Sequence, residues 1–244
     1  MDHTRMKIFM ATLLLVSSLC LPASAWSYSI TNIMNYDDPG TTDLTNGNAV
    51  CGIVSQRLQG AGWTEFFSHS DASAVRADFG TDSGGYQGLD GAHFHWHYGH
   101  GVMPGTMSSI CLSNYPYGYV NRDHVYKKWD NANKWTVIYS CLVLKDRQWG
   151  NALKTAHGIL GFETTVTGTT SLPTSFFSYA IDNDYCMSSA WYYSTLNSFG
   201  SSVTAVAIAD TQLQMTSDQL PGQGHLEPDE DPDDNNGYYS SWAC

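Results

Sequence analysis

Apolar and polar positions follow two different periods along this chain, and the changes of period predict its secondary structure. Strands are predicted where apolar and β-branched residues run together or alternate: 26–36, 63–67, 92–98, 135–144, 159–166 and 203–209. Helices are predicted where apolar residues return every three or four positions: 43–60, 146–157 and 188–199, with a shorter one at 124–130. Because strands and helices alternate, the pattern predicts an α/β fold with a mainly parallel sheet flanked by helices on both faces.

The most apolar of the predicted strands is 135–144, which reads Trp-Thr-Val-Ile-Tyr-Ser-Cys-Leu-Val-Leu. A strand that is apolar at consecutive positions is typical of the middle of a parallel sheet, where both faces are buried. The predicted strand 92–98 ends at Gly99-His100-Gly101. Between these two strands, residues 102–123 predict an irregular excursion with a hairpin around 108–112.

Residues 1–25 have the three parts of a cleavable signal peptide. Two basic residues precede the apolar run 8–21, and Ala23-Ser24-Ala25 supplies the small residues of a cleavage site. The apolar run is short for a bilayer span. We therefore expect a secreted protein, extracellular or periplasmic, with one domain over residues 26–219 and an acidic C-terminal tail over residues 220–244.

The charge of the chain limits the partners that it can bind. Its formal net charge is −12 at pH 7 with histidine neutral. Such a surface repels nucleic acid and anionic lipid. No segment after the signal is apolar enough for a transmembrane helix. We expect no nucleic-acid partner, and no membrane partner once the signal is cleaved.

Five cysteines lie beyond the predicted signal peptide. They are Cys51, Cys111, Cys141, Cys186 and Cys244. An odd number in an exported chain leaves at least one thiol unpaired. Two disulfide bonds and one free thiol are the simplest arrangement, and the pairing stays open at this point.

Two of the predicted strands end at reactive residues, His100 and Cys141. In an open parallel sheet, the carboxyl ends of neighbouring strands meet at one crevice, so these side chains are expected to meet there if the strands are neighbours. A thiol beside an imidazole is the pair that nucleophilic acyl transfer requires. Gly101 leaves room for a substrate, and its N–H group can point at a developing oxyanion.

The two blocks 92–101 and 135–141 resemble the signature of the caspase-like peptidases, a group that includes caspases, legumain, gingipain, clostripain and separase. In these proteins one apolar strand ends in His-Gly and a later apolar strand ends in Ser-Cys or Ala-Cys. The stretch 158–162, Gly-Ile-Leu-Gly-Phe, is also similar to the strand that follows the nucleophile helix in bacterial and archaeal relatives.

The resemblance implies a caspase-like sheet and a secreted cysteine endopeptidase of the caspase or gingipain type, which hydrolyses a protein or peptide substrate without a cofactor. It implies that Cys141 is the nucleophile and His100 the general base and acid. The N–H groups of Gly101 and Cys141 would form the oxyanion hole. The caspase pentapeptide is absent, because Leu-Val-Leu follows Cys141. The aspartate specificity of caspases is therefore not expected here.

Two other functions fit the same residues. The first is a catalytically inactive secreted binding module on the same fold, in which Cys141 is buried or disulfide-bonded. The second is a zinc-dependent hydrolase: His93, His95 and His97 alternate along one strand and so share a face, with His100 just beyond. This run resembles the H-x-H-x-D-H motif of metallo-β-lactamase-like hydrolases, although Gly99 stands in place of the aspartate.

The acidic tail raises the question of calcium. Asp229, Asp231 and Asp233 have the spacing of the first ligands of an EF-hand loop. Asp234 stands where that loop needs glycine, and Ser240 stands where it needs glutamate. The pattern therefore favours a solvated tail, with calcium as an alternative.

Overall fold

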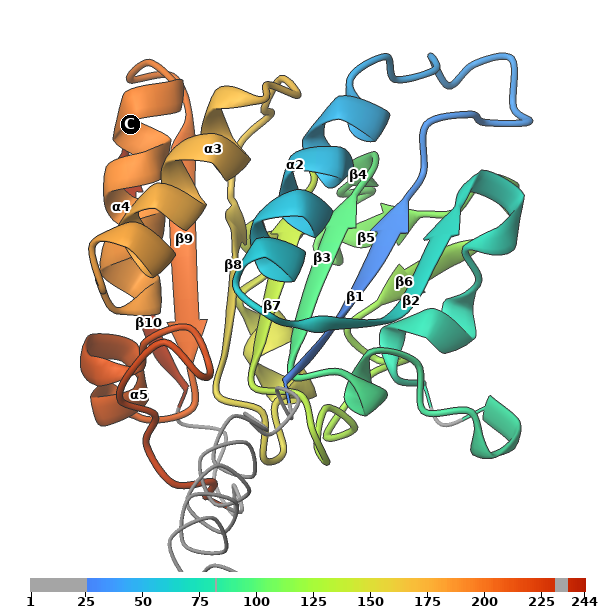
Figure 1. Cartoon of the computed structure of the whole chain (residues 1–244). Helices are drawn as coiled ribbons and strands as arrows, with labels where there is room; N and C mark the ends of the chain where they lie inside the picture. Colours follow the sequence, from blue (N-terminus) through green and yellow to red (C-terminus); the bar gives the residue numbers. More distant parts are fainter. Residues whose placement is uncertain (1–25, 82, 231–236) are drawn as a thin grey trace, which may run out of the picture.

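The computed structural model describes residues 26–81, 83–230 and 237–244, so the predicted signal peptide lies outside the described residues. Figure 1 shows one central sheet with helices packed against it. Its strands are β1 (Ser27–Asn32), β2 (Thr64–Ser70), β3 (Phe94–Tyr98), β7 (Trp135–Tyr139), β8 (Gly158–Phe162), β9 (Thr204–Ala209) and β10 (Tyr238–Ala243). A small sheet contains β4 (Gly101–Val102), β5 (Ser109–Cys111) and β6 (Tyr119–Asn121).

α-Helices and short 3₁₀ segments connect the strands. The α-helices are α2 (Gly47–Gly60), α3 (Ser171–Phe177), α4 (Met187–Ser198) and α5 (Gln212–Ser217), and a π-helix, η7 (Ser178–Asp182), follows α3. The 3₁₀ helices are η1 (Asp71–Ser73), η2 (Arg76–Phe79), η3 (Ser83–Gly85), η4 (Gly88–Gly91), η5 (Val143–Lys145) and η6 (Arg147–Ala152).

The central sheet is mixed but mostly parallel, as the alternating pattern predicted. Its strand order is β10-β9-β8-β7-β3-β1-β2. Strands β2, β1, β3, β7 and β8 run parallel to one another, whereas β9 pairs antiparallel with both β8 and β10. The parallel strands all end at the upper edge in Figure 1, so the segments that follow them gather there.

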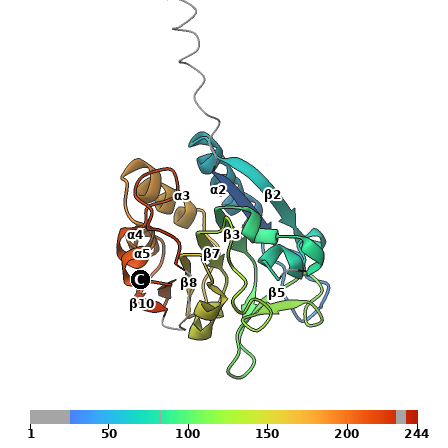
Figure 2. The same cartoon turned by 90° about the horizontal axis from the view of Figure 1, so that it is seen from below.

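The two faces of the sheet are covered differently. Helices α2, α3 and α4 lie on one side, and Figure 2 shows β5 on the other. The first face buries the aromatic residues of β3 and β7 against these helices, including Phe94, Trp96 and Tyr139. The second face packs against the small sheet and the 3₁₀ helices η5 and η6, with Trp129 and Trp149 fully buried.

Three predicted elements differ from the structure because of the local backbone. The strand predicted over 135–144 ends at Tyr139, and Leu142 has a φ of 63°, a left-handed conformation that no strand contains. The helix predicted over 146–157 is the shorter 3₁₀ run η6. Residues 124–130 form turns, because Lys127 has a φ of 48° and its N–H donates to the Asn151 carbonyl at 2.7 Å.

The C-terminal segment was expected to lie outside the core, and its described residues pack otherwise. Residues 238–243 form β10, which pairs with β9 through six residue pairs from Tyr238–Ala209 to Ala243–Thr204. Leu220, at the proposed boundary, is fully buried. The polar composition of the tail concealed this, because β10 is an edge strand with alternating exposure and needs few apolar residues.

The expected disulfide bonds are not present among the described residues. All five cysteines beyond residue 25 are free thiols. Cys51 on α2 and Cys111 on β5 are buried on opposite faces of the sheet, which is too far for a bond between them. Burial raises the pKa of each of these two thiols to about 12, so neither is a reactive thiolate near neutral pH.

Within the described ranges, none of the helices has both the length and the apolar character needed to cross a membrane.

Candidate functional site

Strands β3 and β7 are neighbours, and their pairing brings the two predicted site residues to one edge of the sheet. The strands pair in parallel from Phe94–Trp135 to Tyr98–Tyr139. Just beyond, the Ser140 hydroxyl donates a hydrogen bond to the Gly99 carbonyl at 2.8 Å. His100 and Cys141 therefore follow directly on two chain segments that are joined side by side.

Gly101 lies against the main chain of Cys141. A Cβ atom at position 101 would lie 2.1 Å from the Cys141 carbonyl oxygen and 3.1 Å from the Cβ of Ser140. Any side chain here would therefore push the two segments apart. The close approach gives a physical reason for glycine after His100, and it confirms that the His-Gly and Ser-Cys segments are in contact.

The imidazole of His100 is oriented by main-chain groups. Its Nε2 lies 2.7 Å from the Thr42 carbonyl oxygen. A carbonyl can only accept, so Nε2 carries the proton in this contact, and Nδ1 holds the lone pair in the neutral ring. The imidazole is half-buried at the upper edge of the sheet.

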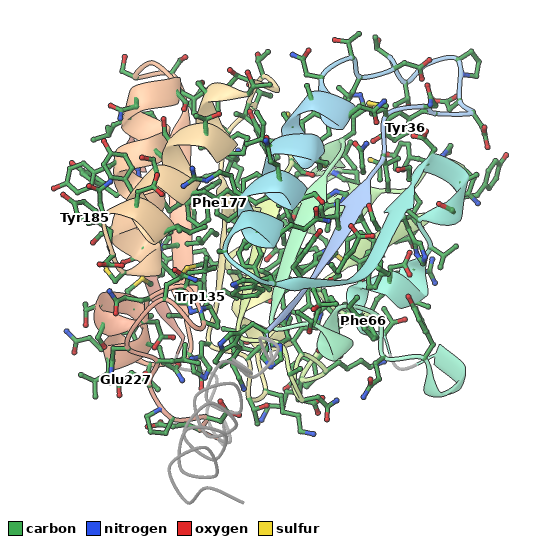
Figure 3. All side chains as sticks on the ribbon, viewed as in Figure 1. Tyr36, Phe66, Trp135, Phe177, Tyr185 and Glu227 are labelled. Atoms are coloured by element: carbon green, nitrogen blue, oxygen red, sulfur yellow. The ribbon has the colours of Figure 1, made fainter. Side chains whose placement is uncertain are left out.

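Tyr36 holds the main chain of His100. The His100 N–H donates to the Tyr36 hydroxyl at 2.7 Å, and that hydroxyl donates to the Ile33 carbonyl at 3.1 Å. Burial raises the pKa of Tyr36 well above its ordinary value, so the phenol stays protonated and can donate. Figure 3 shows Tyr36 beyond the upper end of β1, at the same edge as the ends of β3 and β7.

The Cys141 thiol contacts the segment 163–170 that follows β8. Its Sγ lies 3.4 Å from the Val166 carbonyl oxygen and 3.3 Å from the Val166 nitrogen. Two further contacts fasten this segment: the Tyr139 hydroxyl donates to the Thr167 carbonyl at 2.9 Å, and Asn46 donates to the Gly168 carbonyl at 2.7 Å. Among the described residues no hydrogen bond joins Cys141 to His100, and the thiol is half-buried.

Two cavities lie beside this edge of the sheet. One of about 430 Å³ is lined by residues of the loops after β1, β2 and β5, including Asp37, Arg76 and Ser113. The other, of about 320 Å³, lies over the small sheet and begins at Val102. His100 and Cys141 line neither cavity. Asp37, which lines the first cavity, follows Tyr36 in the chain, and Val102, which lines the second, follows Gly101. Tyr36 contacts His100, and Gly101 contacts the main chain of Cys141.

The three alternating histidines share a face, as predicted, and β1 supplies a hydroxyl for each. Ser27 Oγ lies 3.1 Å from His93 Nδ1, and Ser29 Oγ lies 2.8 Å from His95 Nδ1. Thr31 Oγ1 lies between His95 Nε2 at 3.1 Å and His97 Nδ1 at 2.9 Å. We call these six residues the hydroxyl–imidazole ladder.

The ladder does not resemble a metal centre. His95 and His97 are fully buried, and burial lowers the pKa of His95 well below its ordinary value and that of His97 to about 3. Both nitrogens of His95 and Nδ1 of His97 contact hydroxyl groups of the neighbouring strand, whereas Nε2 of His97 is buried without a hydrogen-bond partner. Across the part of the chain that the structure describes, no group of three or more His, Cys, Asp or Glu side chains is placed to hold a metal ion.

The acidic residues considered for calcium are divided between described and undescribed positions. Asp229 pairs with Lys134 Nζ at 2.6 Å and with His157 Nε2 at 2.9 Å. These partners hold down the pKa of the Asp229 carboxyl, against the opposing effect of its partial burial. Asp231 and Asp233 lie outside the described residues, so the EF-hand-like spacing is not represented in the structure.

A family model covers most of the chain. Residues 30–242 match the model of DUF6345, a family described as a domain of unknown function. The chain belongs to the DUF6345 family. No curated protein matches the chain.

The solved structures show the fold of this DUF6345 domain. The crystal structure of the Drosophila initiator caspase Dronc is similar to it with a TM-score of 0.54, over 85% of this chain and 87% of that chain. The two sequences are only 11% identical, so the similarity concerns the fold. The caspase-like fold expected from the His-Gly and Ser-Cys blocks is confirmed.

Sequence reasoning named two residues of the candidate site and missed the groups that contact them. Thr42 and Val166 act through main-chain atoms, which any residue type supplies, so no sequence signal marks them. Tyr36 acts through its hydroxyl, but a tyrosine just after a predicted strand is too common to single out. The candidate site of this DUF6345 domain therefore includes groups that only the folded chain reveals.

Proposed function

We propose that this DUF6345 protein is a cysteine endopeptidase in which Cys141 is the nucleophile and His100 the general base and acid. The observation that carries the proposal is the pairing of β3 with β7, which places His100 and Cys141 on contacting segments at the carboxyl edge of a caspase-like sheet. The contact between Gly101 and the Cys141 main chain supports the same arrangement. A thiol and an imidazole at one sheet edge suit acyl transfer.

The proposed reaction uses the free lone pair of His100. Since Nε2 is committed to the Thr42 carbonyl, Nδ1 takes the proton of the Cys141 thiol. The thiolate attacks the scissile carbonyl carbon, and the carbonyl π electrons move onto the oxygen, near the N–H groups of Gly101 and Cys141. His100 then gives its proton to the leaving amine as the C–N bond breaks. Water hydrolyses the thioester and returns the thiol.

Substrate entry requires a change at Val166. The Val166 main chain contacts Sγ from both its N–H and its carbonyl, so it occupies part of the approach to the thiol. In the proposed reaction a substrate main chain replaces these contacts. The described conformation then corresponds to a resting form of the enzyme.

The proposal is tested by turnover of a denatured protein substrate. Replacing Cys141 with alanine should abolish cleavage and leave the fold intact. Cys186→Ala is the matched control, because Cys186 is also a half-buried free thiol but lies at the start of α4. Unchanged cleavage by Cys141→Ala, or equal loss in both variants, would contradict the proposed nucleophile.

A second function, a binding module without catalysis, is favoured by one observation: Cys141 bonds to the Val166 main chain and not to His100. In that case the thiol is a packing group that fastens residues 163–170. Rapid alkylation of Cys141 alone in the native protein supports the peptidase. A thiol that stays unmodified until the protein unfolds supports the binding module.

We also propose that the protein acts outside the cytoplasm, on the strength of the signal-like residues 1–25. The substrate is a protein or peptide, and the net charge of −12 disfavours nucleic acid. Mass spectrometry of the exported protein tests the first point. A mature chain that begins at Trp26 supports it, and an intact N-terminus in the cytoplasmic fraction contradicts it.

A further inference from the structure

The cavity of about 320 Å³ beside Gly101 lies on the outward side of the small sheet. Residues pair across the three short strands in rows: Val102 opposite Ser109, and Ser109 opposite Asn121. All three line the cavity. Because successive residues of a strand point to opposite faces, the next row points the other way, into the core.

The inward row confirms this division. Ile110 and Val120, the partners in that row, are fully buried in the core of the second face. Over these two rows, the small sheet uses one face to close the core and the other to line an open cavity. The lining residue Val102 directly follows Gly101, whose main chain lies against that of Cys141.

The lining of this cavity is uncharged and more apolar than polar. Met107, Tyr115 and Tyr119 contribute large apolar surfaces, and two prolines complete it. Asn121 is the most polar member, but its amide donates to Met107 Sδ at 3.0 Å and its Oδ1 accepts from the His124 N–H at 3.2 Å. A ligand would therefore meet mainly hydrocarbon, thioether and aromatic surface, with Ser109 and Asn121 as the polar lining residues.

We propose that this cavity, which we call the Met107 subsite, binds a large apolar side chain of a peptide held at the candidate site. An aromatic side chain is the preferred occupant. This inference rests on the proposed peptidase function. The volume lies at the small end of the range of about 300–1,000 Å³ typical of ligand pockets, which suits one side chain better than a whole small molecule. Tyrosine rings and a methionine sulfur favour an aromatic guest.

The same lining disfavours a charged side chain. An aspartate or lysine in the Met107 subsite would lose water without gaining an ionic partner, since none of the lining residues is charged. The chemistry of this subsite therefore separates apolar from acidic side chains. A peptidase with this subsite would select apolar side chains and would differ in this from an aspartate-specific peptidase.

The first test needs no variant and no turnover. The protein is labelled with ¹³C at its methionine methyl groups and titrated with N-acetyl-phenylalanine amide or N-acetyl-aspartic acid amide. We expect a saturable shift of the Met107 methyl resonance with the phenylalanine amide alone. Met187, buried on the other face of the sheet, is the internal control and should not shift. No shift at Met107, or an equal shift with both amides, would overturn the proposal.

The second test uses peptides that are identical except for one position, occupied by Phe, Ala or Asp and moved along the sequence. At one position, wild type should cleave the Phe peptide at least about tenfold faster than the Asp peptide, as a single apolar contact commonly provides. Met107→Trp, which fills the cavity, should remove this preference. Val75→Trp is the control, because Val75 lines the other cavity.

The two proposals fail in different ways. If no peptide is cleaved but the Met107 methyl still shifts with the phenylalanine amide, the peptidase proposal fails and the subsite stands as a binding site. If peptides are cleaved with no preference for an apolar residue, or Met107→Trp keeps the preference, the Met107 subsite is wrong and the dyad stands.

Discussion

Nε2 of His100 lies 2.7 Å from the main-chain carbonyl oxygen of Thr42, and this contact fixes which imidazole nitrogen is free to take a proton. The carbonyl has no hydrogen to give, so the proton resides on Nε2. Thr42 lies in the loop between β1 and α2, far from His100 in sequence. The orientation of the candidate base thus depends on a loop that makes no direct contact with Cys141 in the described hydrogen-bond network.

Replacing His100 with glutamine tests this assignment. A glutamine amide can still donate to the Thr42 carbonyl, so the loop should stay in place and the unfolding free energy should change by less than about 1 kcal/mol. Glutamine cannot accept a proton, so peptide cleavage should fall by at least about 100-fold. Urea unfolding and cleavage rates measure the two effects. A variant that cleaves at the wild-type rate would show that His100 is not the base.

Gly101→Ala should separate the two segments of the site. The new Cβ would lie 2.1 Å from the Cys141 carbonyl, so the main chains must move apart. We expect a loss of about 1–3 kcal/mol in the free energy of unfolding, typical of overpacking. Cleavage should fall further than stability predicts, because His100 and Cys141 move relative to each other.

Gly52→Ala is the matched control for Gly101→Ala. Gly52 lies within α2, and nothing stands within 4 Å of the position that its Cβ would take. This change should stabilise the protein by roughly 0.5–1 kcal/mol, since alanine is the better helix former. Chemical denaturation of both variants against wild type compares them. Equal effects at positions 101 and 52 would contradict the close approach.

Asn46→Ala should expose the Cys141 thiol. Asn46 donates to the Gly168 carbonyl and is an exposed residue, so its removal loosens residues 163–170 without disturbing the core. One hydrogen bond contributes about 0.5–1.5 kcal/mol, which corresponds to roughly a 2- to 10-fold faster alkylation of Cys141. Asn197→Ala, which removes a hydrogen bond to Tyr179 instead, should leave the rate unchanged.

Acid should destabilise the protein through the hydroxyl–imidazole ladder. The pKa of His95 is lowered by burial and by the neighbouring His97, and burial lowers that of His97 to about 3 from its ordinary 6.5. In the unfolded chain, His95 and His97 bind protons near pH 6.5, whereas in the folded chain they stay neutral at that pH. The free energy of unfolding therefore decreases as the pH falls below that value. The rings facing the pair, Phe67 and Phe79, are uncharged and offer no compensation.

The pH dependence is measured as the free energy of unfolding between about pH 7 and 4.5, above the range in which most carboxylates titrate. His97→Gln should make the curve flatter in this window, because one neutral buried imidazole has been removed. A curve as steep as that of wild type would show that other groups cause the loss.

The main features of the fold were readable from the sequence where burial is uniform. Strand β7 is buried at every position and mostly apolar, and β3 alternates aromatics with histidines, so both were predicted, together with His100 and Cys141, which follow them. The antiparallel direction of β9 was not, because direction depends on the connection between elements and not on apolar periodicity. Strand β10 was missed because an exposed edge strand resembles a polar tail.

The candidate site was predictable only in its side chains. His100 and Cys141 could be singled out from the sequence because their side chains are reactive. The contacts of Thr42 and Val166, and the approach of Gly101 to Cys141, depend on the folded main chain. The disulfide prediction was wrong for a related reason: counting cysteines says nothing of the faces on which they lie. Cys51 and Cys111 are divided by the sheet itself.

The hydroxyl–imidazole ladder also controls alignment between two strands. Apolar side chains slide past one another at little cost, but only one register gives each of His93, His95 and His97 a hydroxyl from β1. A shift of β1 by two residues would leave one of the three imidazoles without a hydroxyl. Tyr36 follows β1 along the chain, so the same shift would draw it away from His100. The hydroxyl–imidazole ladder thus sets the relative positions of Tyr36 and His100, which lie several residues beyond it.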